Sequence, residues 1–144
     1  MESIPILRMG QFLLVTVQAE IDDRLAVQLQ KDLTNKVSYT GARGVLIDIS
    51  GLELVDSFMG RVLSTIASMT KIMDAETVIV GMRPAVAITL VELGLTLPGI
   101  LTALSVESGM DLLRERVSRQ LHGGRLLSDR NGDHLSKTPT DSVD

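Results

Sequence analysis

Apolar and polar residues alternate with two different periods along the first 121 positions of the chain. Two short apolar-rich runs, 4–8 and 12–18, flank the segment Met9-Gly10-Gln11 and predict two strands joined by a hairpin turn. From Asp22 the period lengthens, because apolar residues return at every fourth position with charged residues between them. This spacing predicts an amphipathic helix with one buried face. Its apolar positions are Leu25, Leu29, Leu33 and Val37.

Beyond Gly44, strand-like and helical stretches follow one another in turn. The run Val45–Ile49 is apolar except for Asp48 and lies between two glycines, a pattern typical of a central strand covered on both faces. The other predicted strands are 77–82 and 100–104, and the predicted helices are 57–73, 84–94 and 105–121. Two opening strands followed by alternating helices and strands predict an α/β fold, with helices packed against a mixed β-sheet.

The composition changes at His122. From this residue onward Gly, Ser, Asn and Asp are frequent and the apolar residues show no period. Such a segment buries too little apolar surface to order itself. The sequence therefore predicts one domain over residues 1–121 and a disordered C-terminal tail over 122–144.

Charge and composition narrow the classes of partner. The net charge is -4 and the basic residues form no run, so electrostatics disfavours nucleic acid and anionic membrane surfaces as partners. Aromatic residues make up only 2% of the chain, which leaves few rings to stack on bases. No apolar run approaches the ~20 residues of a membrane span, and no signal peptide or cysteine is visible. We therefore expect a cytoplasmic protein.

Catalytic groups are scarce in the predicted domain. Both histidines, His122 and His134, fall in the tail, so a Ser-His-acid triad within the domain is excluded. No phosphate-binding glycine loop and no nucleophile elbow occur. Asp48, Glu53 and Asp56 are chemically able to bind a hard cation, but solvated charges explain them better. We expect no enzyme activity, no metal and no cofactor.

Ser57 stands at the predicted start of the second helix, directly after Asp56. A serine in this place commonly caps the helix by accepting a hydrogen bond from an unpaired backbone N–H. The same hydroxyl can serve as a phosphate acceptor. We expect Ser57 to be both the cap and the acceptor.

Several segments together resemble one family. An apolar strand, a short loop and Asp-Ser at a helix start, over 45–60, resemble the STAS family of anti-sigma-factor antagonists. The common antagonist pattern continues with Ser or Thr and then Gly, whereas this chain has Phe58 and Met59 before Gly60. That departure, with the segments 4–7, 12–23, 81–87 and 91–94, is similar to the RsbS-type branch of the bacterial stressosome.

The resemblance implies a STAS fold and a scaffold without catalytic activity. Such a scaffold associates with itself and with an RsbR-type STAS protein, and it sequesters an RsbT-type serine/threonine kinase. It implies that the kinase phosphorylates Ser57 and is then released, with Asp56, Ser57 and Phe58 forming the partner-binding surface. An RsbX-type phosphatase would reset the switch.

Three other interpretations stay open at this level. The chain would instead act as a free anti-sigma-factor antagonist that binds its partner one to one. A second alternative is a STAS module that senses a small molecule or a lipid. A hydrolase is the weakest of the three, because the domain has no histidine.

Overall fold

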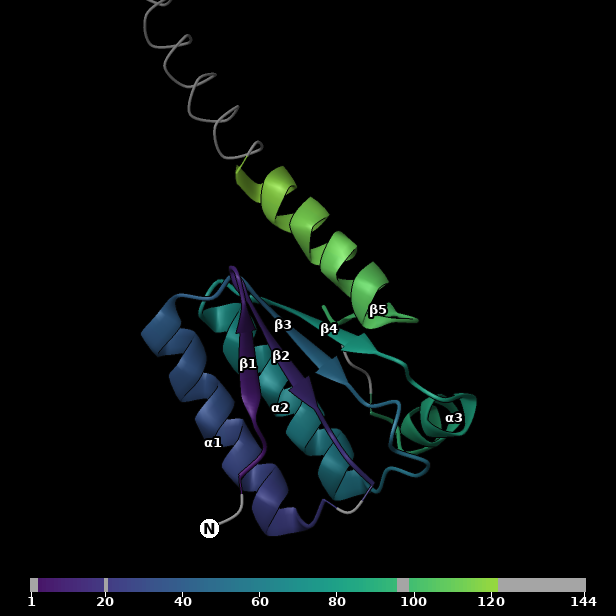
Figure 1. Cartoon of the computed structure of the whole chain (residues 1–144). Coiled ribbons are helices and arrows are strands. Elements are labelled where there is room, and N and C mark those ends of the chain that lie inside the picture. The colour runs from purple at the N-terminus through teal and green to yellow at the C-terminus, as the bar shows by residue number, and fades with distance from the viewer. Residues whose placement is uncertain (1–2, 20, 96–98, 122–144) are drawn as a thin grey trace, which may run out of the picture. The chain divides into compact units, whose positions relative to one another are not determined.

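A computed structural model describes residues 3–19, 21–95 and 99–121 of the chain. It contains a five-stranded sheet with the strands in sequence order (Figure 1). The hairpin pairs β1 with β2 antiparallel, and each later strand pairs parallel with the strand before it. The predicted mixed sheet is thus confirmed. The strands are β1 (Ile6–Met9), β2 (Phe12–Thr16), β3 (Gly44–Asp48), β4 (Glu76–Val80) and β5 (Leu101–Ala103).

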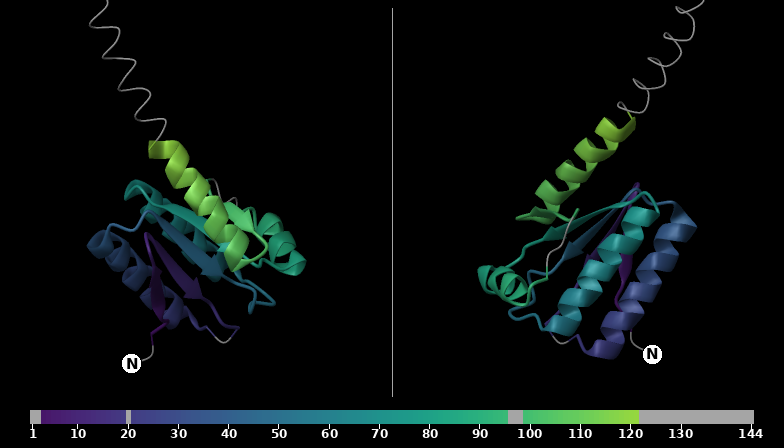
Figure 2. Two further views of the ribbon diagram at one scale, coloured as in Figure 1. Left: turned by 45° about the horizontal axis from the view of Figure 1, so that its top comes forward. Right: turned by 180° about the vertical axis from the view of Figure 1, so that it is seen from behind.

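Helices connect the parallel strands. They are α1 (Asp23–Thr40), α2 (Ser57–Ile72) and α3 (Pro84–Glu92), and residues 106–121 form a further helix. α1 and α2 pack against each other on one face of the sheet and run in the same direction, since each connects two parallel strands (Figure 2). Their N-termini therefore lie next to each other. The chain divides into two compact units, 1–113 and 114–144, and the helix 106–121 crosses the division.

Local signals in the sequence explain the limits of α1. Asp22 has an extended backbone and its carboxylate accepts a hydrogen bond from the Leu25 N–H at 2.7 Å. Gly41 closes the helix in the left-handed conformation (φ 67°) and donates its N–H to the Val37 carbonyl. The predicted four-residue repeat is confirmed, because Leu29, Leu33 and Val37 are all buried while Leu25 packs at the margin of the core.

β3 is covered on both faces, as its apolar sequence predicts. Val45 and Ile47 belong to the main core beneath α1 and α2. Leu46 points to the other face, where a Cβ on Gly109 would approach its side chain to 2.8 Å. The glycine thus lets the start of the helix 106–121 pack closely on this face of the sheet. The alternation of the strand sends successive side chains to opposite faces.

Most element boundaries agree with the sequence to within about two residues, which is the usual uncertainty of such boundaries. Pro84 occupies the first position of α3, where its missing N–H leaves no hydrogen bond unmade. Ser105 precedes the last helix, and its hydroxyl accepts a hydrogen bond from the Ser108 N–H, as predicted for a cap. The predicted tail, 122–144, lies outside the described residues.

Candidate functional site

The candidate site is the connection between the carboxyl end of β3 and the first turn of α2. Leu52 and Val55 are buried and anchor this loop to the core. Between them the loop exposes Glu53 and Leu54, and the Leu54 side chain is 79% exposed. The loop therefore presents one acidic and one apolar side chain beside the start of α2.

Asp56 is the cap of α2. Its backbone is extended (φ -89°, ψ 175°), and its carboxylate accepts a hydrogen bond from the Met59 N–H at 2.8 Å. Ser57 is consequently the first residue inside the helix. The prediction that Ser57 caps α2 is wrong, because the cap is the last residue with an extended backbone, and aspartate fills that role as well as serine does.

Because Asp56 is the cap, the Ser57 hydroxyl is not needed to cap the helix. Ser57 is exposed, and within the part of the chain that the structure describes its hydroxyl makes no hydrogen bond. It stands in the first turn of a 16-residue helix, where unpaired N–H groups and the helix dipole favour negative charge. The geometry can thus accept a phosphate on Ser57 without breaking an existing contact of that hydroxyl.

The three residues of the predicted partner-binding surface differ in accessibility. Asp56 and Ser57 are exposed, whereas Phe58 is half-buried and packs against the main core. Only part of the Phe58 ring is therefore available to a partner. Leu54, which the sequence analysis did not single out, is the more exposed apolar side chain of this site. In the sequence, the indication for Leu54 was its place as an apolar residue next to an acidic one in a short loop.

The turn between β4 and α3 braces the loop. Arg83 donates from Nε to the Ser50 carbonyl oxygen at 3.0 Å, and Ser50 donates its N–H to the Asp48 carboxylate at 3.0 Å. Gly81 has a φ of 73°, and a Cβ there would meet the Ser50 Cβ at 2.8 Å. The two turns lie too close for a larger residue at position 81. Sequence reasoning missed this contact, because nothing local links Arg83 to Ser50.

Gly60 allows a second close approach. A Cβ on this residue would clash with Leu95 Cδ1 and would lie 3.1 Å from Leu90 Cδ2. The first turn of α2 therefore packs directly against the end of α3 and the residues after it. A glycine inside a helical pattern is a signal for such packing. The site is thus held by α3 from one side and by the core from the other.

A small cavity next to the site is lined by acidic side chains. The N-termini of α1 and α2 border a small cavity of about 200 Å³, to which Asp22, Asp23 and Asp56 all contribute. None of the described residues that line it is basic. Within the described residues, no three His, Cys, Asp or Glu side chains are arranged to hold a metal ion. Asp48 and Asp56, two of the carboxylates considered as cation ligands, instead accept backbone N–H groups.

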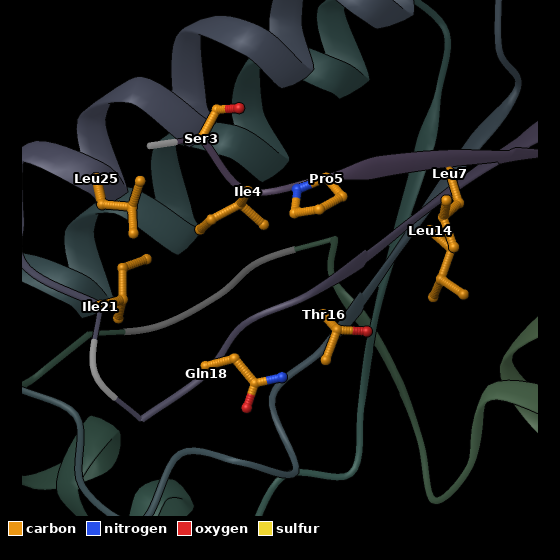
Figure 3. A pocket seen from close by; sticks show the side chains of 9 residues that line it. All are labelled: Ser3, Ile4, Pro5, Leu7, Leu14, Thr16, Gln18, Ile21 and Leu25. Atoms are coloured by element: carbon orange, nitrogen blue, oxygen red, sulfur yellow. The ribbon is translucent and has the colours of Figure 1, made fainter. Parts of the chain in front are cut away.

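A second hollow, of about 480 Å³, lies beside the start of β1 (Figure 3). Figure 3 shows Ile4, Ile21 and Leu25 gathered toward one end and Leu7 and Leu14 toward the other. The lining is mostly apolar and carries no charged side chain among the described residues. The described residues that line it are Ser3, Ile4, Pro5, Leu7, Leu14, Thr16, Gln18, Ile21 and Leu25.

The sheet order, the helix placement and the Asp-Ser pair at the start of α2 together define a known class of domain. The family model described as STAS domain matches residues 3–109. The chain belongs to the STAS family, and the resemblance drawn from the sequence is confirmed. No helix within the described residues has the length and apolarity that crossing a membrane requires.

Within that family the chain is similar to stressosome proteins. A structure of a variant of RsbS from Moorella thermoacetica has a TM-score of 0.74 and 36% identity, covering 80% of this chain and 97% of that one. A chain from a structure of the molecular architecture of the stressosome has a TM-score of 0.71 and 37% identity, covering 78% and 98% respectively.

Two curated relatives are similar to this chain over part of their own length. The RsbT co-antagonist protein RsbRA of Bacillus subtilis (strain 168) is 28% identical over 101 residues, which are 70% of this chain and 37% of that protein. RsbRD of the same organism is 30% identical over 91 residues, 63% of this chain and 33% of that protein. The chain thus spans about a third of the length of these relatives.

Proposed function

We propose that this protein is a non-enzymatic, cytoplasmic scaffold of a bacterial stressosome that holds a serine/threonine kinase and releases it when Ser57 is phosphorylated. One observation carries the proposal. Asp56 caps α2, so the exposed Ser57 hydroxyl is free to act as a phosphate acceptor at a helix N-terminus.

The relatives support the identity of the partners. The curated relatives are named as RsbT co-antagonists, and the similar solved chains are RsbS and a stressosome component. By analogy, an RsbR-type STAS protein would assemble with this chain and with further copies of it. An RsbT-type kinase would bind over Asp56, Ser57 and Phe58, and an RsbX-type phosphatase would remove the phosphate.

Bulk and desolvation of the phosphate, and not charge alone, would explain release. Phosphorylation adds about -1.5 to -2 charge units to a surface on which Asp22, Asp23 and Asp56 already lie close together. A kinase that binds an acidic surface needs a complementary, basic one, and a modest extra charge would strengthen that attraction. Release must therefore come from bulk and desolvation, because a phosphate under a packed interface has to lose its water. Leu54 and Phe58 supply the apolar area from which that interface would be built.

The direct test is phosphate transfer followed by site mapping. The purified chain is incubated with the candidate kinase and ATP, and its intact mass is measured. We expect one added phosphate on the wild type and none on Ser57→Ala. Ser50→Ala is the matched control, since Ser50 is also exposed and lies in the same loop.

Capture of the kinase completes the test. Ser57→Ala should retain the kinase in the presence of ATP, whereas the wild type and Ser50→Ala should release it. If Ser57→Ala still gains the phosphate, the acceptor lies elsewhere and the proposal fails. Ser64 and Thr65 would then be examined first, although both are half-buried within α2.

The apolar hollow of Figure 3 favours one second candidate, a STAS module that senses an uncharged apolar ligand. Native mass spectrometry of the purified protein would detect a retained ligand. Thr16→Trp should fill the hollow and remove the bound mass. Thr102→Trp, which alters an exposed threonine on β5, should leave it in place. A wild-type spectrum that shows the bare chain alone would refute this candidate.

A further inference from the structure

One methionine sulfur in the contact between α1 and α2 faces two hydrogen-bond donors. The Gln30 side chain donates from Nε2 to the Met69 Sδ at 3.9 Å, and the Thr34 hydroxyl lies 3.8 Å from the same sulfur. Both donors come from α1, one turn apart, whereas Met69 belongs to α2. A thioether sulfur is only a weak acceptor. The contact thus gathers two donors around an atom that binds them poorly.

These two donors have few other partners. Within the described residues the Gln30 amide nitrogen donates to no other atom. The Thr34 hydroxyl divides its proton between the Met69 sulfur and the Gln30 carbonyl oxygen, which lies at 2.7 Å. Both side chains are half-buried, so water replaces a missing acceptor only in part. Because a partly buried donor without a good acceptor costs free energy, a stronger acceptor at the sulfur would stabilise this contact.

Oxidation of the sulfur supplies such an acceptor. Methionine sulfoxide is polar, and its oxygen accepts hydrogen bonds far better than the thioether does. A hydrogen bond of about 2.8 Å to that oxygen, with the usual bent angle at the acceptor, leaves the donor about 3.8 Å from the sulfur. The two donors already lie at 3.8 and 3.9 Å from it. The sulfoxide oxygen therefore fits between them at the existing spacing of the two helices.

The sulfur of Met69 is also accessible. Its side chain is half-buried, whereas Met59 and Met110 are only 7% and 8% exposed. Met73 and Met82 are half-buried as well, but within the described residues no donor faces either sulfur. Among the described methionines, solvent access and waiting donors therefore coincide at Met69.

We propose that Met69 is a site of oxidation by a hydroperoxide, and that Gln30 and Thr34 hold the resulting sulfoxide in the contact between α1 and α2. The sulfur lone pair attacks one oxygen of hydrogen peroxide and the O–O bond breaks. The departing hydroxide takes the proton of the transferred oxygen and leaves as water. The sulfur thus loses two electrons and the peroxide gains them.

The consequence differs from the usual effect of this modification. Oxidation commonly disrupts a packed methionine, because it turns an apolar side chain into a polar one. At Met69 the two donors offset that cost, so the modified domain stays folded and stable. The site does not involve Ser57. Failure of this proposal leaves the kinase proposal intact, and the reverse also holds.

Oxidation of one methionine at a time tests the proposal, with hydrogen peroxide as the probe. The triple variant Met9→Leu, Met73→Leu, Met82→Leu leaves Met69 as the accessible methionine among the described residues. Its control, Met9→Leu, Met69→Leu, Met82→Leu, leaves Met73 instead. Peptide mass spectrometry confirms one added oxygen at the intended position. We expect the Met69 sulfoxide to keep the Tm within about 2 °C and the Met73 sulfoxide to lower it by about 5 °C or more. Equal shifts would overturn the proposal.

Removal of the donors tests what holds the sulfoxide. In the background that retains Met69, Gln30→Leu together with Thr34→Val removes both donors, and oxidation should then lower the Tm by about 5 °C or more relative to the same variant when reduced. Gln28→Leu together with Thr89→Val is the matched control. Gln28 is exposed on α1, and Thr89 on α3 bonds a carbonyl of its own helix as Thr34 does. Oxidation should leave the Tm of this control within about 2 °C. If the variant without donors tolerates oxidation as well as the control does, the proposal fails.

Discussion

The N-termini of α1 and α2 share a capping aspartate and differ in the residue that follows it. Each helix follows an aspartate whose carboxylate accepts the N–H of the third helical residue, at 2.7 Å for Asp22 and 2.8 Å for Asp56. The two termini border the same small cavity. The first helical residue, however, is Asp23 in α1 and Ser57 in α2. One helix carries a permanent negative charge where the other carries a hydroxyl.

The comparison of these two positions distinguishes an effect of charge on the fold from an effect of charge on binding. α1 shows that a helix of this domain accepts a negative charge at its first position, as the helix dipole favours. A phosphate on Ser57 would place charge at the equivalent position of α2, and the fold should accept it in the same way. We therefore expect phosphorylation to change what binds to this surface and to leave the domain folded.

The largest expected effect concerns kinase binding. Phosphorylated wild-type protein should bind the kinase about 30- to 150-fold more weakly than the unmodified protein, which corresponds to ~2–3 kcal/mol for burying the phosphate. Titration of labelled kinase with each form measures the ratio. Equal affinities would mean that Ser57 lies outside the kinase interface, and the comparison with α1 would then have no functional meaning.

Removing a cap should have the next largest effect, and it should be the same for both helices. Asp22→Ala and Asp56→Ala should each lower the free energy of unfolding by about 1 kcal/mol, because each leaves one N–H without its partner. Ser57→Ala should change it little, since Ser57 makes no cap bond. Urea denaturation provides the measurement. If Ser57→Ala lowered the free energy of unfolding as much as Asp56→Ala does, Ser57 and not Asp56 alone would act as the cap.

Ser57→Asp gives both helices an aspartate at the cap and at the first helical position. The free energy of unfolding should rise by about 0.3 kcal/mol at low salt, a gain reduced by repulsion from the neighbouring carboxylates. The gain should disappear in 1 M salt, where the screening length is ~3 Å. Kinase binding should weaken only in part, because a carboxylate has less charge and fewer oxygens than a phosphate. A marked destabilisation at low salt would contradict the equivalence of the two termini.

The reciprocal change, Asp23→Ser, should have a comparably small effect of opposite sign. It removes one favourable charge at the start of α1, so the free energy of unfolding should fall by about 0.3–1 kcal/mol at low salt. The new serine should not accept phosphate, because Leu54 and Phe58 flank the start of α2 and have no counterpart at the start of α1. Intact mass of Asp23→Ser in the Ser57→Ala background reports this directly. Phosphate on position 23 would show that the kinase recognises an Asp-Ser pair at a helix start and nothing further.

The elements of the fold were predictable because their signals are local. Buried apolar residues repeat every third or fourth position in α1, and β3 is a short apolar run between glycines, so each period is visible in a window of a few residues. The order of strands and helices then limits the sheet to few arrangements. The STAS family followed from motifs that lie in order along the chain.

The start of α2 was predicted correctly, and its cap was misassigned. Asp56 and Ser57 are both good capping residues, and the choice between them depends on which residue has the extended backbone. That choice follows from how Leu52 and Val55 anchor the loop in the core, which no local pattern reports. The contact between Arg83 and Ser50 was missed for the same reason, since 33 residues separate them.

The sequence by itself determined the periods of the helices and strands, the mixed sheet, the absence of histidine and cysteine from the domain, and the Asp-Ser pair at a helix start. Tertiary structure alone decided which of that pair is the cap and which face of α3 is left exposed. It also decided that Asp22, Asp23 and Asp56 share one cavity. Periodicity is a property of neighbouring residues, whereas exposure and charge density depend on segments that only the folded chain brings together.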